Sequence, residues 1–356
     1  MRRILTLLLL VAAPFVSGQR RRAVIPPDLP PCFMVDGTPA VTFTRDHGRT
    51  LAPIAQRLEG IGYTYGLAAL DVPRTLLSWH RDTLSISTDA GCHWRALGDY
   101  TSDFPPTITA AQGGQAYIWS DNRPFLMRYD SGGVVTLKAP GAIIGLAAAP
   151  NDGSRVRAGD SLGIVWESTD AGAIWTRIGS LMNMPGLFYR FAFDPNDLDH
   201  VVAGTAVTGA YVSRDGGKNW THATGFGSES VNAFNFAVSP VDGNVIWSMA
   251  LDMGGSGKHI DLSTDGGLTY RPVVDAGPEV TIVNQPVMVA HPADRNVMYF
   301  VFGTYFQGYG TDLFRYDDST RTLTKAHNDY DDINAIAFAL GRPDVMYLGL
   351  EVERGR

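Results

Sequence analysis

Cysteine is scarce in this sequence: only Cys32 and Cys92 occur among 356 residues, and charged residues make up 18% of the chain. No group of His and Cys has zinc-site spacing, no glycine-rich loop leads from a strand into a helix, and no nucleophile elbow occurs. No long amphipathic helical pattern is present either. The sequence therefore lacks the common signatures of zinc enzymes, nucleotide-binding proteins and α/β-hydrolases, and we expect neither a metal nor a cofactor.

The one pronounced apolar run lies near the N-terminus, where Ile4 to Val16 follow Arg2 and Arg3 and precede Ser17-Gly18. This order predicts a secretory signal peptide over residues 1–18, cleaved near Gly18. The run is too short for a spanning helix, which needs about 20 residues, so we do not expect an integral membrane protein. The arginines at 20–22 are unusual after a cleavage site, and an uncleaved anchor stays open as the alternative. We expect a secreted or periplasmic protein.

The formal net charge is −7, and removal of residues 1–18 would make it −9, because only Arg2 and Arg3 are lost. An acidic exported chain is poorly suited to non-specific binding of nucleic acid. An oxidising compartment would permit a disulfide between Cys32, in the N-terminal arm, and Cys92, in a predicted turn. Two separate thiols are the alternative.

Glycine and proline are plentiful, with 39 and 21 residues spread along the chain, which indicates many tight turns between short strands. An octapeptide of the form Ser-x-Asp-x-Gly-x-x-aromatic recurs at 87–94, 168–175, 213–220 and 263–270, and three weaker copies fall in step with it. Its aspartates recur every 40 to 52 residues, a period that fits one propeller blade. They are Asp46, Asp89, Asp130, Asp170, Asp215, Asp265 and Asp317.

The octapeptide has the chemistry of a hairpin turn, because Asp accepts hydrogen bonds from nearby amides and Gly adopts positive φ. We therefore interpret its aspartates as structural. Paired apolar runs before several copies, such as 191–195 with 201–205, predict the first two strands of each blade. One strand precedes Asp46, and 333–353 supplies two strands without a further copy. The two ends of the chain are therefore expected to complete one shared blade.

The predicted fold is all-β: a seven-bladed β-propeller of four-stranded antiparallel blades, closed by N- and C-terminal strands sharing one blade. The propeller should span residues 39–356, after a signal peptide at 1–18 and an N-terminal arm at 19–38. A monomer is expected.

The octapeptide resembles the Asp-box, or BNR, repeat of sialidases, sortilin-type receptors, two-propeller xyloglucanases and the photosystem II assembly factor family. The resemblance covers about residues 39–356 and is strongest to the single-propeller, assembly-factor-like group, which implies binding or scaffolding. Sialidases would imply an Arg-Ile-Pro element, but here Ala23-Val24 precedes Ile25-Pro26. The sialidase site is therefore not transferred. A xyloglucanase cleft would need a second propeller.

Candidate ligand-binding residues lie in the loops predicted on the face opposite the octapeptide turns. Aromatic rings beside polar groups suit sugars or peptides, and charged side chains at the channel mouth would orient them. These candidates are His80, Arg81, Asp121, Arg123, Tyr189, Arg190, Tyr305, Phe306 and Tyr309. Packing over the rim is the alternative for the aromatic residues.

The leading hypothesis is an exported, non-enzymatic propeller that binds protein or glycan through its loop face. The alternative is a glycoside hydrolase of sialidase-like or xyloglucanase-like type, for which Asp331 and Asp332 are the candidate acid/base pair. A solvated acidic turn is the simpler interpretation of that pair.

Overall fold

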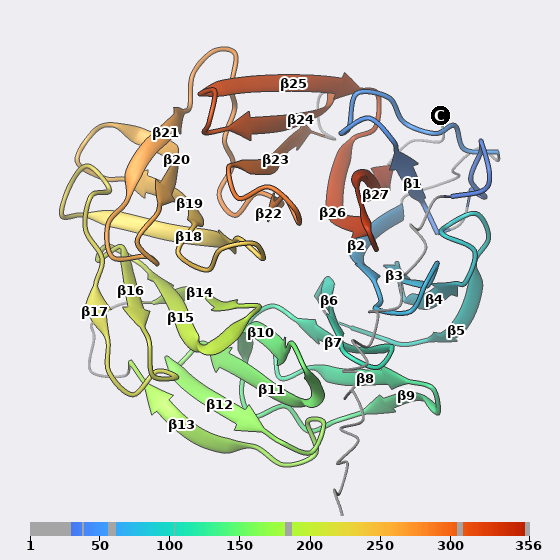
Figure 1. The fold of residues 1–356 in the computed structure, drawn as a ribbon, viewed down its shortest axis with the longest axis horizontal. Coiled ribbons are helices and arrows are strands. Elements are labelled where there is room, and N and C mark those ends of the chain that lie inside the picture. Colours follow the sequence, from blue (N-terminus) through green and yellow to red (C-terminus); the bar gives the residue numbers. More distant parts are fainter. Residues whose placement is uncertain are drawn as a thin grey trace, which may run out of the picture.

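The computed structural model describes residues 30–37, 39–55, 62–102, 104–181, 187–304 and 309–352 (Figure 1). The described residues form strands and turns, and every paired strand runs antiparallel to its partner. None of them forms a helix of the length and apolarity needed to cross a bilayer. The sheets are arranged radially as a β-propeller (Figure 1). The predicted signal peptide and the first part of the predicted arm lie outside the described residues.

Five sheets have four strands each, and within each sheet every strand pairs with the next one along the chain. They comprise β6 (Pro106–Ala111), β7 (Gln115–Ser120), β8 (Leu126–Asp130) and β9 (Gly133–Thr136); β10 (Ile143–Ala149), β11 (Asp152–Asp160), β12 (Ile164–Ser168) and β13 (Thr176–Ser180); β14 (Phe188–Asp194), β15 (Asp197–Thr205), β16 (Ala210–Ser213) and β17 (Thr221–His222); β18 (Val231–Val238), β19 (Ile246–Asp252), β20 (Gly257–Ser263) and β21 (Arg271–Asp275); and β22 (Met288–Ala290), β23 (Val297–Thr304), β24 (Gly310–Asp317) and β25 (Thr322–Asn328).

A sixth sheet contains seven strands and closes the ring. Its members are β26 (Asp332–Ala339), β27 (Arg342–Val352) and β1 (Val41–Thr44), followed by β2 (Gly62–Ala69), β3 (Leu76–His80), β4 (Thr83–Ser87) and β5 (Arg95–Asp99). The strands β26, β27 and β1 form one group and β2 to β5 form another. The ladder between the groups consists of Gly62 opposite Val352 and Tyr63 opposite Glu351. Each group occupies its own position around the ring (Figure 1).

Both ends of the chain contribute to this closing sheet, as the sequence predicted. Four register pairs join β1 to β27, from Val41 opposite Gly349 to Thr44 opposite Met346. A fourth strand was also expected after β1, but the described residues 45–55 form no named strand. Ala52 donates its amide to Phe43 O at 2.8 Å, but the next residue, Pro53, has no amide hydrogen with which to extend the ladder.

The four full octapeptides form the same turn between the third and fourth strands of their sheets. In the first copy, Ser87 Oγ accepts from the Gly91 amide at 2.9 Å and donates to Asp89 Oδ1, also at 2.9 Å. Asp89 Oδ1 accepts from the His93 amide, and Trp94 Nε1 donates to Gly91 O. The equivalent Asp215 has its pKa lowered to about 2, chiefly by the Asn219 amide. These aspartates therefore act as turn acceptors at the ends of their hairpins.

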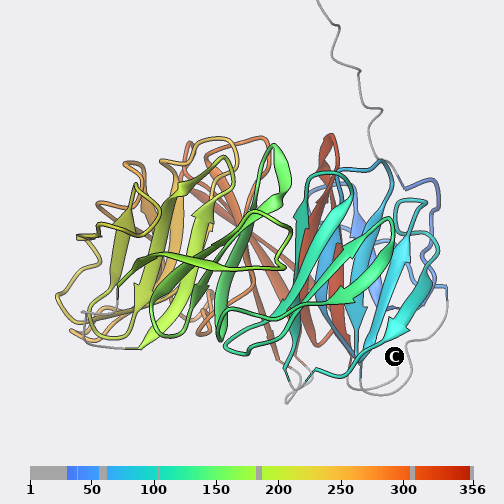
Figure 2. The ribbon, with the colours of Figure 1, turned by 90° about the horizontal axis from the view of Figure 1, so that it is seen from below.

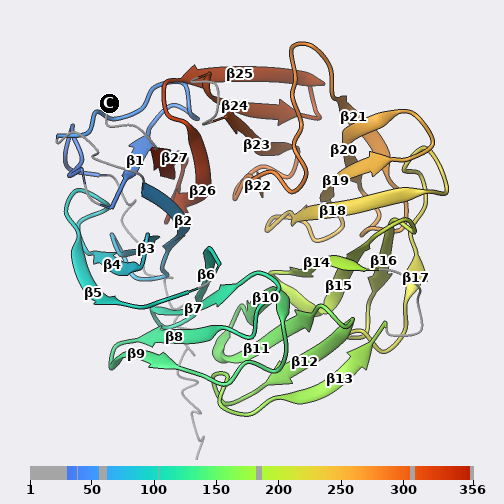
Figure 3. The ribbon, with the colours of Figure 1, turned by 180° about the vertical axis from the view of Figure 1, so that it is seen from behind.

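The octapeptide turns, which join the third and fourth strands of their sheets, lie on one face of the ring. Because the strands are antiparallel, the turns between the second and third strands lie on the opposite face, which we call the loop face. Figure 2 shows the strands running between these two faces. Figure 3 shows the ring from behind. The loop face includes the turns at 161–163, 206–209 and 253–256.

Neighbouring sheets pack closely where small residues face large ones. Phe191, on β14, is buried against Gly145 and Gly159 of the preceding sheet. A Cβ atom on Gly145 would lie 2.0 Å from the Phe191 carbonyl oxygen. The two glycines therefore create the space in which Phe191 joins the two sheets.

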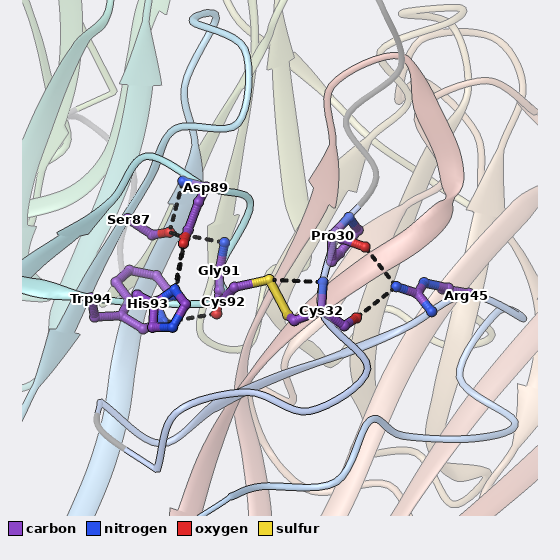
Figure 4. Close-up of a disulfide and its surroundings, with 9 residues drawn as sticks. All are labelled: Pro30, Cys32, Arg45, Ser87, Asp89, Gly91, Cys92, His93 and Trp94. Atoms are coloured by element: carbon purple, nitrogen blue, oxygen red, sulfur yellow. Dashed lines mark hydrogen bonds and ion pairs between the residues drawn. A yellow bond between two sulfur atoms is a disulfide. The ribbon is translucent and has the colours of Figure 1, made fainter.

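A disulfide joins Cys32 to Cys92, with a Cα–Cα distance of 5.9 Å (Figure 4). It connects the segment before β1 to the octapeptide turn that follows β4. Arg45 supports the same segment by donating to Pro30 O at 2.6 Å and Cys32 O at 2.9 Å. The disulfide thus fixes the segment before β1 to the β2–β5 part of the same closing sheet.

Candidate functional site

A cavity of about 600 Å³ lies at the centre of the ring. The cavity is lined by residues of the innermost strands, which converge on the centre of the ring in Figure 1. These strands are β2, β6, β10, β14, β18, β22 and β26. The lining combines apolar side chains with nearly as much polar surface. Its polar groups include Tyr65, Arg190, Asn235 and Asn334.

Arg190 is the cationic group of this cavity and reaches two other sheets from the start of β14. Its Nη1 lies 3.4 Å from Asp121 Oδ1, in the turn after β7, and its Nε donates to Asn235 Oδ1 on β18 at 3.3 Å. The guanidinium also lies 5.8 Å from the Trp119 ring. Burial raises the pKa of Asp121, and the nearby Arg190 only partly offsets this. Both polar contacts are at the long end of the hydrogen-bond range, so Arg190 retains donor capacity for a ligand.

The other candidates of this region have structural partners. Arg123 lies 3.7 Å from the centroid of the Phe104 ring, next to the Asp121 turn. Tyr189 packs its ring 4.6 Å from that of Phe234 and belongs to the packing between sheets. Of these predicted residues, the structure brings Asp121 and Arg190 into direct contact and directs Arg123 and Tyr189 to aromatic neighbours.

His80 and Arg81 lie where β3 turns into β4. His80 Nδ1 is 2.8 Å from Thr64 Oγ1, and burial, with a smaller contribution from Arg81, lowers the pKa of His80 to about 4. His80 is therefore neutral at physiological pH. Arg81 adopts a φ of 54° and donates its amide to Tyr63 O at 3.0 Å. At this corner His80 therefore supplies a neutral imidazole, and Arg81 beside it supplies the charged group.

Tyr305 and Phe306 lie outside the described residues, whereas Tyr309 is described and half-exposed. Its hydroxyl donates to Asp312 Oδ2 at 3.1 Å, and its ring contacts His327 edge-on at 5.1 Å. His327 Nδ1 in turn lies 2.8 Å from Asp312 Oδ1. Tyr309 is thus fixed over the outer strands of its sheet.

Asp331 and Asp332 lie in the closing sheet, where Asp332 faces Glu351 across β26 and β27. The pKa of Asp332 is raised to about 7, chiefly by burial and to a smaller extent by the negative charges of Glu351 and Asp331. Asn334 Nδ2 donates to Glu351 Oε2 at 2.9 Å. Among the described residues, no three His, Cys, Asp or Glu side chains are grouped so that they could hold a metal ion.

Replacing Asp332 by Asn is expected to change how stability depends on pH. A carboxyl whose pKa is 3.8 in the unfolded chain and about 7 in the folded chain destabilises the fold as pH rises between these values. The variant should therefore gain melting temperature relative to the unaltered chain at pH 8 and little at pH 4. Thermal denaturation at both pH values tests this, with Asp197→Asn, an exposed residue at the start of β15, as control. An equal difference at both pH values would contradict it.

Sequence comparison provides the family. No family model matches the chain. The dispase autolysis-inducing protein of Streptomyces mobaraensis is 48% identical over 334 residues, which cover 90% of this chain and 89% of that protein. The chain belongs to the dispase autolysis-inducing protein family.

Solved structures resemble this member of the dispase autolysis-inducing protein family in fold alone. YCF48 bound to D1 peptide matches 83% of this chain and 95% of its own, with a TM-score of 0.56 and 16% identity. The GH74 xyloglucanase from Xanthomonas campestris matches 75% of this chain, with a TM-score of 0.57 and 16% identity. This chain spans 45% of the xyloglucanase. These structural comparisons therefore show the β-propeller fold and do not show an activity.

Sequence reasoning missed three members of the site in this family member: Trp119, Asn235 and Glu351. Asn235 carried a weak signal, because it interrupts the otherwise apolar run Ala233 to Val238 on an inner strand. Its amide donates to Pro286 O at 2.9 Å, which fixes its oxygen toward Arg190. Glu351 carried the same kind of signal, because it is a charged residue in the apolar end of β27, whereas Trp119 gave none.

Proposed function

We propose that the chain is an exported, non-enzymatic β-propeller that binds a protease through its loop face and promotes self-cleavage of that protease. The observation that carries the proposal is the 48% identity to a protein whose name states that it induces autolysis of dispase. The proposal includes a signal peptide at 1–18, an N-terminal arm at 19–38 and a propeller at 39–356. It also includes seven blades with Asp-box turns, which follow if the sixth sheet is counted as two blades.

Binding alone is sufficient to promote autolysis. A protease is cleaved by other copies of itself when a segment opens locally, and the rate follows the population of the open form if opening is fast. A protein that binds the open form more tightly than the closed form raises that population. Equal affinity for both forms would have no effect. The proposed role therefore needs a selective binding surface and no catalytic group in the propeller.

The loop face provides groups for such a surface. Arg190 has donor capacity at the mouth of the central cavity and is preceded on the same strand by Phe188 and Tyr189. The YCF48 structure with the D1 peptide is a precedent for peptide binding by this fold.

The test is to incubate dispase with the purified chain, residues 19–356, and follow intact dispase by gel electrophoresis. Faster loss of dispase with the chain, and no loss when the dispase active site is inhibited, is the expected result. Cleavage of inhibited dispase would show that the chain itself hydrolyses protein and would overturn the non-enzymatic proposal. Dispase that persists unchanged would overturn the protease partner, and turnover of a polysaccharide would favour a glycoside hydrolase.

Replacing Arg190 by Ala is expected to weaken binding to inhibited dispase by about 10-fold or more, because a charged hydrogen bond contributes about 1.5–3 kcal/mol. Titration calorimetry would measure the change. Arg271→Ala is the matched control, since Arg271 pairs with Asp318 on the outer strands, with an Nη2–Oδ1 distance of 2.7 Å. Equal loss in both variants would contradict a specific role for Arg190.

A further inference from the structure

Four exposed aliphatic side chains follow one another along the loop face of three neighbouring sheets. They are Leu162, Leu187, Val207 and Met253, with 66%, 70%, 56% and 58% of their surfaces exposed. Three occupy the tips of second-to-third-strand turns, and Leu187 directly precedes β14. We call these four residues the apolar arc.

Contacts made by intermediate residues connect the segments that carry the apolar arc. Leu187 O accepts from the Ala206 amide at 2.8 Å, which joins the start of β14 to the Val207 turn. Asn232 accepts from the Val207 amide at 2.8 Å, and its Nδ2 lies 3.6 Å from the Met253 sulfur. On the other side, the Phe188 ring packs against Gly163, next to Leu162. The segments that carry the apolar arc are therefore held next to one another.

Val207 is held in a backbone conformation that its side chain disfavours. Its φ is 70°, a region where β-branched residues are rare and where Gly or Asn would be relaxed. Its amide is fixed by Asn232, and its carbonyl accepts from the Val231 amide at 2.9 Å. Strain of this kind persists where the surrounding contacts impose it, and it clusters at binding sites. No burial of the side chain compensates the strain here.

A groove of about 710 Å³ adjoins Val207 at the outer rim. It forms because β17 has only two residues, whereas the outer strands β5, β9, β13, β21 and β25 have four to seven. The chain after β17 leaves the sheet edge and crosses to the next sheet, where Thr224 bridges to Thr269. Phe226 is buried in the groove, and Glu229 is exposed at its rim.

The chemistry of this surface favours a protein as its occupant. No Lys or Arg is present among the apolar arc and the groove lining, so an anionic membrane would find no attraction. Tyr211 and Phe226, the ring side chains that suit sugar stacking, are buried. Exposed aliphatic groups beside one carboxylate fit a partner surface that is apolar and carries a basic side chain next to it.

We infer that the apolar arc and the adjoining groove are the surface on which the protease of the proposed function docks, so that this inference rests on that function. Leu187 of the apolar arc directly precedes β14, and Arg190 lies three residues further along the same chain segment. The partner would place apolar side chains on the apolar arc and a basic residue near Glu229.

Val207→Asn tests the inference, because Asn removes the apolar side chain and tolerates positive φ. Binding to inhibited dispase should weaken at least 10-fold, while the melting temperature stays equal or rises. Val241→Asn is the control, since Val241 is an exposed valine in a first-to-second-strand turn on the opposite face. Its binding should equal that of the unaltered chain.

Two results would overturn the inference. Full binding by Val207→Asn, with binding by the unaltered chain confirmed, would remove the apolar arc from the interface and leave the proposed function standing. Absence of binding by the unaltered chain would overturn both. Analytical ultracentrifugation completes the test: a dimer of the unaltered chain that Val207→Asn abolishes would assign the apolar arc to a second copy and overturn the protease as occupant.

Discussion

Replacing Cys32 and Cys92 together by Ser is expected to lower the free energy of unfolding by about 4 kcal/mol. The two residues are 60 positions apart in sequence, and a crosslink over a loop of this size removes about that much chain entropy from the unfolded state. In the folded protein the disulfide fixes the segment before β1 to the turn after β4, so the variant would lose this link between the two groups of strands in the closing sheet (Figure 4).

Urea denaturation followed by tryptophan fluorescence would measure this loss as a lower midpoint. The unaltered chain in reducing agent is the control, and it should shift to the same midpoint as the double variant. Substituting both cysteines avoids a free thiol. An unchanged midpoint in both cases would show that the retained Arg45 bonds to Pro30 and Cys32 are sufficient to hold the segment.

Gly145→Ala is expected to cause a loss of several kcal/mol or to prevent folding. The added Cβ would lie 2.0 Å from the Phe191 carbonyl oxygen and 2.7 Å from its carbonyl carbon. Because both atoms are backbone, no side-chain rotation relieves the clash, and β10 must move away from β14. The glycine is required here for close approach of two sheets and not for positive φ.

Gly277→Ala is the matched control, because a Cβ at Gly277 meets nothing within 4 Å. Its stability should equal or slightly exceed that of the unaltered chain, since alanine restricts the unfolded state. Thermal melting of both variants, followed by circular dichroism, would measure the difference in their stability. A Gly145→Ala protein as stable as the control would mean that the contact between the two sheets is not rigid.

The sequence predicted the propeller because its turns are local. Ser87, Asp89 and Gly91 form their hydrogen bonds within five residues, so the pattern and the geometry coincide. The pairing of β1 with β27 could be predicted because a strand missing at one end had a counterpart at the other.

The site was harder to predict because it depends on which residues face each other across the ring. Asp121 and Arg190 are 69 residues apart and come from sheets that are not neighbours in sequence. Tyr189 was predicted to bind ligand, yet it packs on Phe234, because adjacent residues of a strand point to opposite sides. Nothing in the sequence distinguished Val207, because the feature that sets it apart is its backbone φ of 70°.

The pairing of β1 with β27 also determines when the ring can close during folding. The contact joins residues about 300 positions apart, among the most distant in the chain, and such contacts form late in folding because they close the longest loops. During synthesis, individual hairpins can form as they emerge, but the circle cannot close until the final strand is made. A chain interrupted before β27 would keep an open sheet edge at each end, and such edges are susceptible to proteolysis and aggregation. The ring can therefore close only after β27 has been synthesised.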